Sequence, residues 1–323
     1  MQGNPHFFKT FTIICSVFTI VPFYIGILLQ KTPFYGIFNE RPWEAFSMYT
    51  HLFHYETPAL YVGYKRDEPG TFLPLDMHVH SYYELNYFVS CKGYYDIEGV
   101  RYPVFPGCIL LIRPNEAHMP RIDTNVCYDR LTYNFSPRIL EELDPDGLLK
   151  NFMDNLPSPQ ILLPAEYDLF FKQLFQSLPG LNGASPDAQR SFSLSILTVA
   201  LLELRSIYNT SPDTSLAPGN SISDVIRDVL LYMNDHLTEE LSLDDLCRRF
   251  GLSKSYLNRC FKEITGATPW NYILVKRLSL ARQYIQNGIP VQAAYRSCGF
   301  HDYSAFYRSY IKRFGVAPTE DVN

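Results

Sequence analysis

The segment Leu246-Cys-Arg-Arg-Phe-Gly-Leu-Ser253 determines the predicted fold of the last third of this chain, because the pattern that it begins occurs twice. The pattern continues through Leu257, Phe261, Gly266 and Pro269. A second copy begins with Ala294-Tyr-Arg-Ser-Cys-Gly-Phe-His301 and continues through Phe306, Tyr310, Gly315 and Pro318. Each copy predicts a short helix, a glycine turn and a second helix with its own stop. The sequence therefore predicts two helix-turn-helix units.

Capping residues and apolar spacing define the first unit. Ser242 is placed to cap a first helix, and Gly251 tolerates the left-handed backbone of the turn that follows it. Ser253 is placed to cap the second helix, in which Leu257 and Phe261 belong to the apolar stripe. The opposite face of that helix is polar and basic, which suits a DNA major groove. The candidate DNA-binding residues of this helix are Lys254, Ser255, Asn258, Arg259 and Lys262.

The second unit repeats this arrangement. Val291 and Ala294 begin its first helix, and Phe306, Tyr310 and Phe314 anchor the second. Residues 270–286 between the units contain no glycine or proline, which predicts one helix that holds the two units at a fixed separation. The candidate DNA-binding residues of the second unit are Tyr303, Ser304, Tyr307, Arg308 and Lys312.

On these residues, 222–318 resembles the DNA-binding domain of the AraC-type transcription regulators. The family signature runs through Gly299-Phe300, Phe306, Phe314-Gly315 and Pro318, with Tyr272 and residues 277–281 in the linking helix. The resemblance implies two recognition helices in successive major-groove segments on one face of DNA, roughly 34 Å apart. A helical bundle without a DNA role is the alternative that helical stripes alone leave open.

The chain departs from the family pattern at three positions. Cys247 and Tyr295 stand where the family usually has alanine, and Ile311 stands where it often has lysine. Tyr295 is the largest change, because the family packs a methyl group closely at that position. Either the second unit is shifted or its neighbours make room. The small Ala294, where the family has a bulkier residue, favours the second option.

The charge of the chain is distributed unevenly. From Ser221 onward there are 13 Lys and Arg against 11 Asp and Glu, and before it 15 against 22, which together give the formal net charge of −5. This overall acidity argues against non-specific coating of nucleic acid. The small positive balance at the C-terminal end fits a sequence-specific protein with its charge on a few helices.

Residues from about 56 to 136 predict β structure. Short apolar runs are broken by Lys92-Gly93, Glu98-Gly99, Pro106-Gly107 and Pro114-Asn115, which is typical of a small barrel or jelly roll. The pattern His78-Val-His80-Ser-Tyr-Tyr-Glu84, followed by Pro106-Gly107 and His118, resembles the two motifs of a cupin barrel. Sensor domains of AraC-type regulators share this barrel, so the resemblance implies an effector-sensing domain.

Two interpretations of His78, His80, Glu84 and His118 are open. Two histidines one residue apart on a strand point to the same face, so the four side chains could form a metal site with nitrogen and oxygen ligands. They could instead contact an organic effector. We adopt the effector interpretation, with no metal and no cofactor. Several nearby tyrosines favour a sugar or an aromatic effector.

The remaining segments complete the predicted organisation. Residues 211–221 form a flexible linker, and the apolar helix expected within residues 191–208 is either buried or pairs with its twin in a homodimer. Seven scattered cysteines without a Cys-x-x-Cys pair indicate reduced intracellular thiols. We thus expect a cupin-like sensor at 48–136, a helical dimerisation region at 137–210, a linker at 211–221 and the DNA-binding domain at 222–318.

The first 47 residues fit none of these domains. Residues 7–29 have Lys9 as their only charge and are long enough to cross a bilayer. The segment is a membrane anchor, an ordered apolar arm or a non-native extension upstream of a start at Met48. We favour the extension.

The predicted fold class is α+β multidomain, and the predicted protein is a cytoplasmic regulator that binds double-stranded DNA and responds to a small molecule. RNA polymerase is a further expected contact, and the choice between activation and repression stays open. The rivals are a metal-dependent cupin enzyme with an appended helical domain and a membrane-tethered regulator. No nucleotide-binding loop or nucleophile elbow occurs in the sequence, so we do not expect an enzyme.

Overall fold

The computed structural model describes residues 50–321 except 73, 74, 76, 158, 162, 164 and 211–223. The chain divides into two compact units, residues 1–37 and 38–323, and the description below concerns the second. The expected apolar extension at 1–47, with its membrane-length segment 7–29, lies outside the described residues, as does the expected linker at 211–221.

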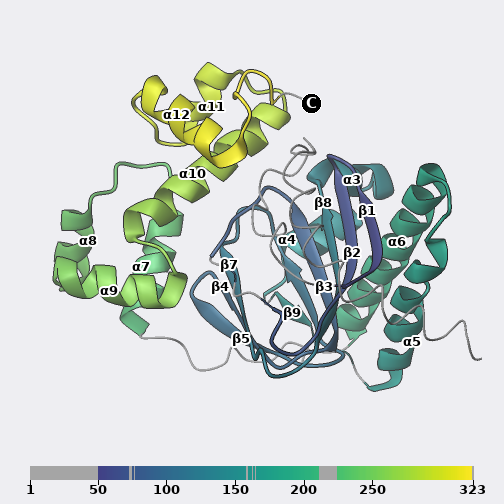
Figure 1. Cartoon of the computed structure of the whole chain (residues 1–323). Coiled ribbons are helices and arrows are strands. Elements are labelled where there is room, and N and C mark those ends of the chain that lie inside the picture. Colours follow the sequence, from purple (N-terminus) through teal and green to yellow (C-terminus); the bar gives the residue numbers. More distant parts are fainter. Residues whose placement is uncertain are drawn as a thin grey trace, which may run out of the picture. The chain divides into compact units, whose positions relative to one another are not determined.

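Two antiparallel sheets form the N-terminal part of this unit (Figure 1). The larger sheet has the order β1-β2-β8-β3-β6-β9 and the smaller has the order β5-β4-β7. The bounds are β1 (Thr50–Glu56), β2 (Leu60–Asp67), β3 (Tyr83–Ser90), β4 (Gly93–Ile97), β5 (Val100–Val104), β6 (Ile109–Ile112), β7 (His118–Ile122), β8 (Tyr128–Phe135) and β9 (Gln160–Ile161).

The alternation of side chains along each strand builds two separate apolar layers. Phe88 and Leu110 of the larger sheet pack against Tyr95 and Ile97 of the smaller one, which fills the space between the sheets. Tyr87 and the other side chains of the opposite face belong to a second cluster, which includes the helices described next. The larger sheet is therefore covered on both faces.

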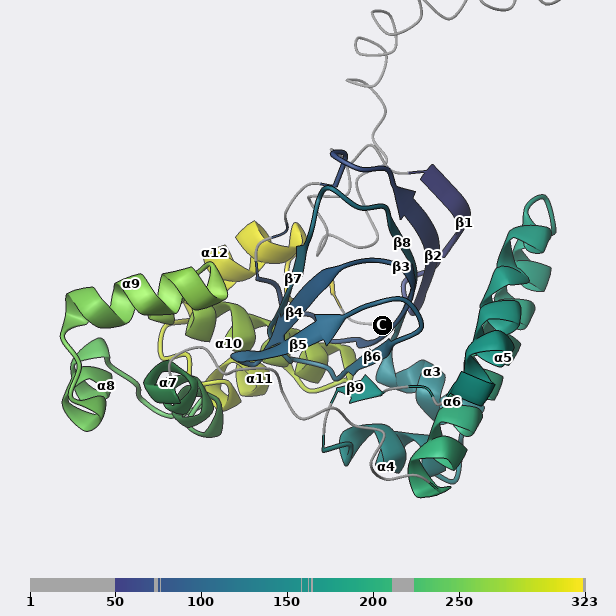
Figure 2. The same ribbon diagram turned by 90° about the horizontal axis from the view of Figure 1, so that it is seen from below.

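The helical segment after β8 covers the outer face of the larger sheet (Figure 2). It comprises α3 (Pro137–Leu143), α4 (Leu148–Asp154), α5 (Ala165–Gln176), the 3-10 turn η2 (Leu178–Leu181) and α6 (Pro186–Thr210). Leu197, Leu201 and Leu204 of α6 are fully buried, whereas Phe192, Val199 and Leu202 are exposed. In the described part of the chain, α6 alone has the length and apolar character to span a bilayer, and 44% of its apolar window is buried.

Within residues 224–321, the structure has the six helices α7 (Asp224–Asp235), α8 (Leu243–Phe250), α9 (Lys254–Thr265), α10 (Pro269–Gln286), α11 (Val291–Ser297) and α12 (Tyr303–Phe314). The predicted caps are confirmed, because the side chains of Ser242 and Ser253 accept the backbone N–H of Asp245 and Tyr256. Gly251 adopts the expected left-handed backbone with φ 65°. The α+β fold with two helix-turn-helix units is therefore confirmed.

The second unit keeps its geometry around the unusual tyrosine. Tyr295 is buried against Tyr303 and Phe306, while its neighbour Ala294 is fully buried in the same cluster. Arg296 donates from Nε to the Tyr295 hydroxyl at 3.1 Å. The neighbours of Tyr295 have thus made room for its ring, as the small Ala294 indicated.

Candidate functional site

The proposed recognition face of α9 is available to solvent. Lys254, Ser255, Arg259 and Lys262 are exposed and Asn258 is half-buried, while Leu257, Phe261 and Ile264 are buried beneath them. The Lys254 ammonium pairs with the Asp244 carboxylate at 2.7 Å, and Asn258 Nδ2 donates to the Lys254 carbonyl at 2.9 Å.

The corresponding face of α12 is more aromatic. Ser304, Arg308 and Lys312 are exposed, whereas Tyr303 and Tyr307 are half-buried with ring centroids 5.9 Å apart. Asp302 caps this helix by accepting from the backbone N–H of Ser304 and Ala305. The exposed residues are candidates for contact with DNA, and the two tyrosines also support the helix.

Arg277 of α10 joins the two helix-turn-helix units. Its Nε donates to the Leu237 carbonyl at 2.7 Å and its Nη1 to the Gly299 carbonyl at 2.8 Å. A β-carbon at Gly299 would lie 2.7 Å from the Thr238 carbonyl oxygen, so only glycine permits this approach. The structure thus gives a physical reason for two residues of the family signature, which the sequence alone presented only as a pattern.

The histidine cluster consists of His78, His80 and His118, whose ligand atoms all lie within 4.8 Å of one another. One part of the prediction is wrong: His78 and His80 do not lie on a regular strand. His78 forms an isolated antiparallel bridge with His118, with both N–H to carbonyl distances at 3.0 Å, and β3 begins only at Tyr83. The segment that carries His78 and His80 is thus irregular before β3 begins. The bridge still brings the rings together: the centroid of the His118 ring lies 4.2 Å from that of His78 and 4.8 Å from that of His80.

Glu84 places a carboxylate beside this cluster. Its Oε2 lies 2.9 Å from His80 Nε2 and 3.6 Å from His118 Nε2, and all three side chains are buried. Burial alone would raise the pKa of Glu84, but the adjacent His118 and His80 side chains outweigh it and hold that pKa well below its usual value. For His118, burial would lower the pKa, but the Glu84 carboxylate outweighs it and the pKa is raised.

The donor set fits two kinds of ligand. His118 Nδ1 donates to the Glu116 carbonyl at 2.8 Å, while His118 Nε2 is buried without a hydrogen bond. In a tetrahedral site with bonds of about 2.1 Å, donor atoms lie roughly 3.4 Å apart, which is close to the two separations from Glu84. These residues could therefore hold zinc or a related ion, or bind a polar group of an organic effector.

The tyrosines near the cluster are mostly structural. Tyr87, Tyr128 and Tyr133 are fully buried in the two cores. Tyr82 and Tyr83 are also buried, and their hydroxyls donate to the Pro58 carbonyl and to Asp154. Of this set, Tyr94 is exposed, and it lines a cavity of about 820 Å³ together with Arg121 of β7 and Lys262 of α9. Nothing in the sequence had singled out that cavity.

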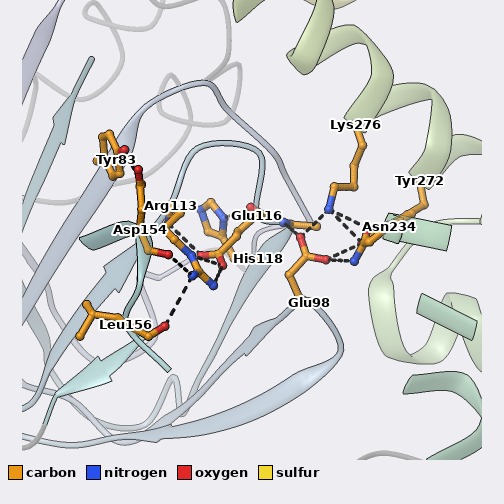
Figure 3. Close-up of polar contacts among 11 residues, drawn as sticks. Tyr83, Glu98, Arg113, Glu116, His118, Asp154, Leu156, Asn234, Tyr272 and Lys276 are labelled. Atoms are coloured by element: carbon orange, nitrogen blue, oxygen red, sulfur yellow. Dashed lines mark hydrogen bonds and ion pairs between the residues drawn. The ribbon is translucent and has the colours of Figure 1, made fainter. Parts of the chain in front are cut away.

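The sequence also missed Glu98. It was expected only as a turn residue, yet its carboxylate is bonded to residues of α7 and α10 (Figure 3). Arg113 and Glu116, which flank the Pro114-Asn115 turn, form an ion pair beside His118 in the same view. No local pattern signals such contacts, because the partners are distant in sequence.

Comparisons with known proteins agree with this arrangement. The family model of the AraC-like ligand binding domain matches residues 64–199, and that of a helix-turn-helix domain matches residues 246–322. The uncharacterized HTH-type transcriptional regulator YbfI of Bacillus subtilis is 27% identical over 232 residues, 70% of this chain and 79% of that protein. The HTH-type transcriptional activator RhaS of Salmonella dublin is 24% identical over 256 residues, 75% of this chain and 86% of that protein. A solved structure of ToxT from Vibrio cholerae is 13% identical, with a TM-score of 0.33 over 81% of this chain and 97% of that one.

Proposed function

This chain belongs to the AraC-type transcription regulators, and we propose that it reads its operator through α9 and α12 while the histidine cluster binds its effector. It is a sequence-specific DNA-binding regulator with a ligand-binding domain. The DNA contacts proposed are those of the exposed polar faces described above. The single observation that carries this assignment is that both second helices present such a face while α10 and Arg277 hold their units together.

The test of DNA binding uses the full chain and DNA sequences that it selects from a random pool. Arg259→Ala and Arg308→Ala should each weaken binding to the selected duplex and broaden the selected sequence at one position. Arg227→Ala, which changes a cation on α7 and not on α9 or α12, is the matched control. Failure of the wild-type chain to select any sequence would refute the proposal.

For the effector, we propose that His78, His80, Glu84 and His118 bind a polar group of a small organic molecule. Their support is that the four side chains are buried and that His118 Nε2, 3.6 Å from Glu84 Oε2, makes no hydrogen bond within the part of the chain that the structure describes. The donor set also suits a metal-dependent enzyme, but the relatives are transcription regulators, so we propose no catalytic activity. Isothermal titration with sugars and aromatic acids, repeated on His80→Ala, tests the assignment.

We further propose a homodimer that pairs through α6. Phe192, Val199 and Leu202 are exposed and lie within a sector of about 80° around the helix axis, at 100° per residue. The other side of α6 is already buried in the core of the same chain, so this second apolar face is free to meet a twin helix. Two copies would place four helix-turn-helix units on paired half-sites.

The proposed cellular location follows from the proposed binding to promoter DNA. A chain that binds the promoter acts in the cytoplasm, and because RhaS is named a transcriptional activator, we propose activation with RNA polymerase as a contact. A membrane tether through residues 7–29 is the remaining alternative. Fractionation of cells that express the full chain, compared with a chain that begins at Met48, distinguishes the two.

A further inference from the structure

We propose that the surface on which the sensor barrel meets the DNA-binding helices couples the histidine cluster to DNA binding, because two segments of the chain contribute residues to both. The sensor barrel is β1–β8, the DNA-binding helices are α7–α12, and the two segments are residues 78–80 and 115–118. The inference rests on the proposed function and adds its regulation.

Glu98 is the centre of this docking surface. It lies at the tip of the β4–β5 hairpin with φ 48°, and its carboxylate accepts from Lys276 Nζ at 2.7 Å and from the Tyr272 hydroxyl at 2.8 Å (Figure 3). Asn234 of α7 donates to the same carboxylate. Burial would raise the pKa of Glu98, but the charge and hydrogen bond of Lys276 outweigh it, and the pKa is lowered. The pair is therefore ionised, with the Lys276 side chain buried and the Glu98 side chain 18% exposed.

The hairpin also approaches α7 without room for a side chain. Gly99 is buried beside Glu98, and a β-carbon there would collide with Leu230. Val79 and Ala117 of the barrel belong to the same apolar cluster as Leu230 and Met233 of α7. The Glu98–Lys276 ion pair and the apolar contacts with α7 thus lie on the same surface between the barrel and the helices.

Five more hydrogen bonds, made by three barrel residues, anchor both helix-turn-helix units to the barrel. Asn115 Nδ2 donates to Gln283 at 2.8 Å, and the Ser279 hydroxyl donates to Asn115 at 2.7 Å, both on α10. Arg121 Nη2 donates to the Glu263 and Ile264 carbonyls at the end of α9, at 3.0 and 3.1 Å. Arg313 of α12 donates to the Val79 carbonyl at 3.4 Å.

The residues that make these contacts are the immediate neighbours of the cluster. Ala117 precedes His118, and its N–H donates to Glu98. Val79 stands between His78 and His80, and Asn115 N–H donates to the His80 carbonyl at 2.8 Å. A ligand that shifts these two segments therefore acts on the contacts of three partners: α10 through the Asn115 side chain, α12 through the Val79 carbonyl and Glu98 through the Ala117 N–H.

The largely enclosed Glu98–Lys276 ion pair gives this surface two discrete states. A buried ion pair that loses one partner leaves an uncompensated charge, whereas full separation lets water reach both groups. Partial opening is therefore disfavoured, and the surface is either closed or open. A ligand with different affinity for the two states shifts the balance between them.

The closed state is the one we assign to DNA binding. It leaves Lys254, Arg259 and Arg308 exposed, so neither recognition face is covered. It also fixes both units to one rigid barrel, so less freedom remains to be lost on the operator.

The first experiment measures amide hydrogen exchange in the full chain. Glu98→Gln should raise exchange in α7 and α10 about tenfold or more. Asp67→Asn is the matched control, because Asp67 is a buried carboxylate paired with Arg130 inside the barrel. Unchanged exchange of α7 and α10 in Glu98→Gln contradicts the proposal, as does an equal rise in Asp67→Asn. If the single variant does not fold, Glu98→Gln with Lys276→Met removes both charges, and the same rise is expected.

The second experiment measures binding to the duplex that the wild-type chain selects. Glu98→Gln should weaken it about tenfold, while Asp67→Asn stays near the wild-type value. Tighter or unchanged binding by Glu98→Gln refutes the assignment of the closed state. A wild-type chain that binds no DNA refutes the proposed function instead, so the two failures are distinguishable.

The third experiment perturbs the cluster itself. Glu84→Gln removes the carboxylate between His80 and His118, and it should change exchange in α10 at least threefold although Glu84 does not belong to the docking surface. An α10 that exchanges as in the wild type shows that the cluster and the docking surface are not coupled.

Discussion

The ring of Tyr295 stacks on that of Phe306, with centroids 5.6 Å apart and ring planes at 27°. Tyr295 is buried, and the side chain of its neighbour Ala294 is too small to fill the space of the ring. Tyr295→Ala should therefore leave a cavity in the second unit. Loss of a large buried aromatic typically costs about 3 kcal/mol, so the free energy of unfolding should fall by that order. Chemical denaturation of the full chain measures this change in unfolding free energy, and a separate binding assay measures the effect on DNA binding.

A compensating variant makes this prediction specific. Ala294→Ile combined with Tyr295→Ala restores the family pattern and should recover most of the lost stability and DNA binding. Tyr94→Ala, which removes an exposed ring from the barrel, should change the free energy of unfolding by less than about 0.5 kcal/mol. A Tyr295→Ala chain more stable than the parent would show that the ring is strained.

The helices were predictable from the sequence because their signals are local. Ser242, Gly251 and Ser253 define the first unit within a dozen residues, and the apolar period of 3.6 gives its buried face. The residues that form the cluster were predictable, but the prediction that His78 and His80 lie on a regular strand was wrong. The bridge of His78 to His118 depends on pairing across the barrel, which no local pattern signals. Glu98 was not predictable as a contact, because its partner Lys276 is 178 residues away.

The next prediction concerns base recognition by α9. Arg259→Ala or Asn258→Ala should each cost about 1–3 kcal/mol at the selected operator and relax its sequence preference, because each removes a donor from the exposed face. Competition with scrambled DNA checks this. Equal loss on operator and scrambled duplexes would mean that the residues contact phosphates rather than bases.

The cluster yields a prediction about metal. If an organic effector is its ligand, elemental analysis of the purified chain should find far less than one metal ion per chain, and a chelator should leave DNA binding unchanged. Stoichiometric zinc, iron or manganese that is lost in His80→Ala together with DNA binding would overturn the effector assignment and favour the metal site that the donor geometry permits.

The docking surface should respond to acid. Lys276 lowers the pKa of Glu98, and Tyr272, Asn234 and the Ala117 N–H are its other hydrogen-bond partners. A carboxyl whose pKa is lowered on folding adds stability above its ordinary value of 4.5 and loses it as pH falls through the folded-state pKa. The difference in unfolding free energy between wild type and Glu98→Gln should therefore be constant near neutrality and shrink below pH 4.5. A difference that grows on acidification has the wrong sign for this pair.

The last prediction concerns α6 and the oligomeric state. Leu202 is 48% exposed on the face that it shares with Phe192 and Val199, so a charge there would have to be buried in a dimer that pairs through this face. Leu202→Glu should raise the dimer dissociation constant at least tenfold in sedimentation equilibrium and leave the fold intact, because the opposite side of α6 supplies the core contacts. Leu169→Glu is the matched control: Leu169 is 61% exposed on α5, so the same charge change lies outside the proposed interface. If both variants dissociate alike, the interface extends to α5. If Leu202→Glu stays as dimeric as the wild type, the pairing does not use this face, and α6 is only the cover of the larger sheet.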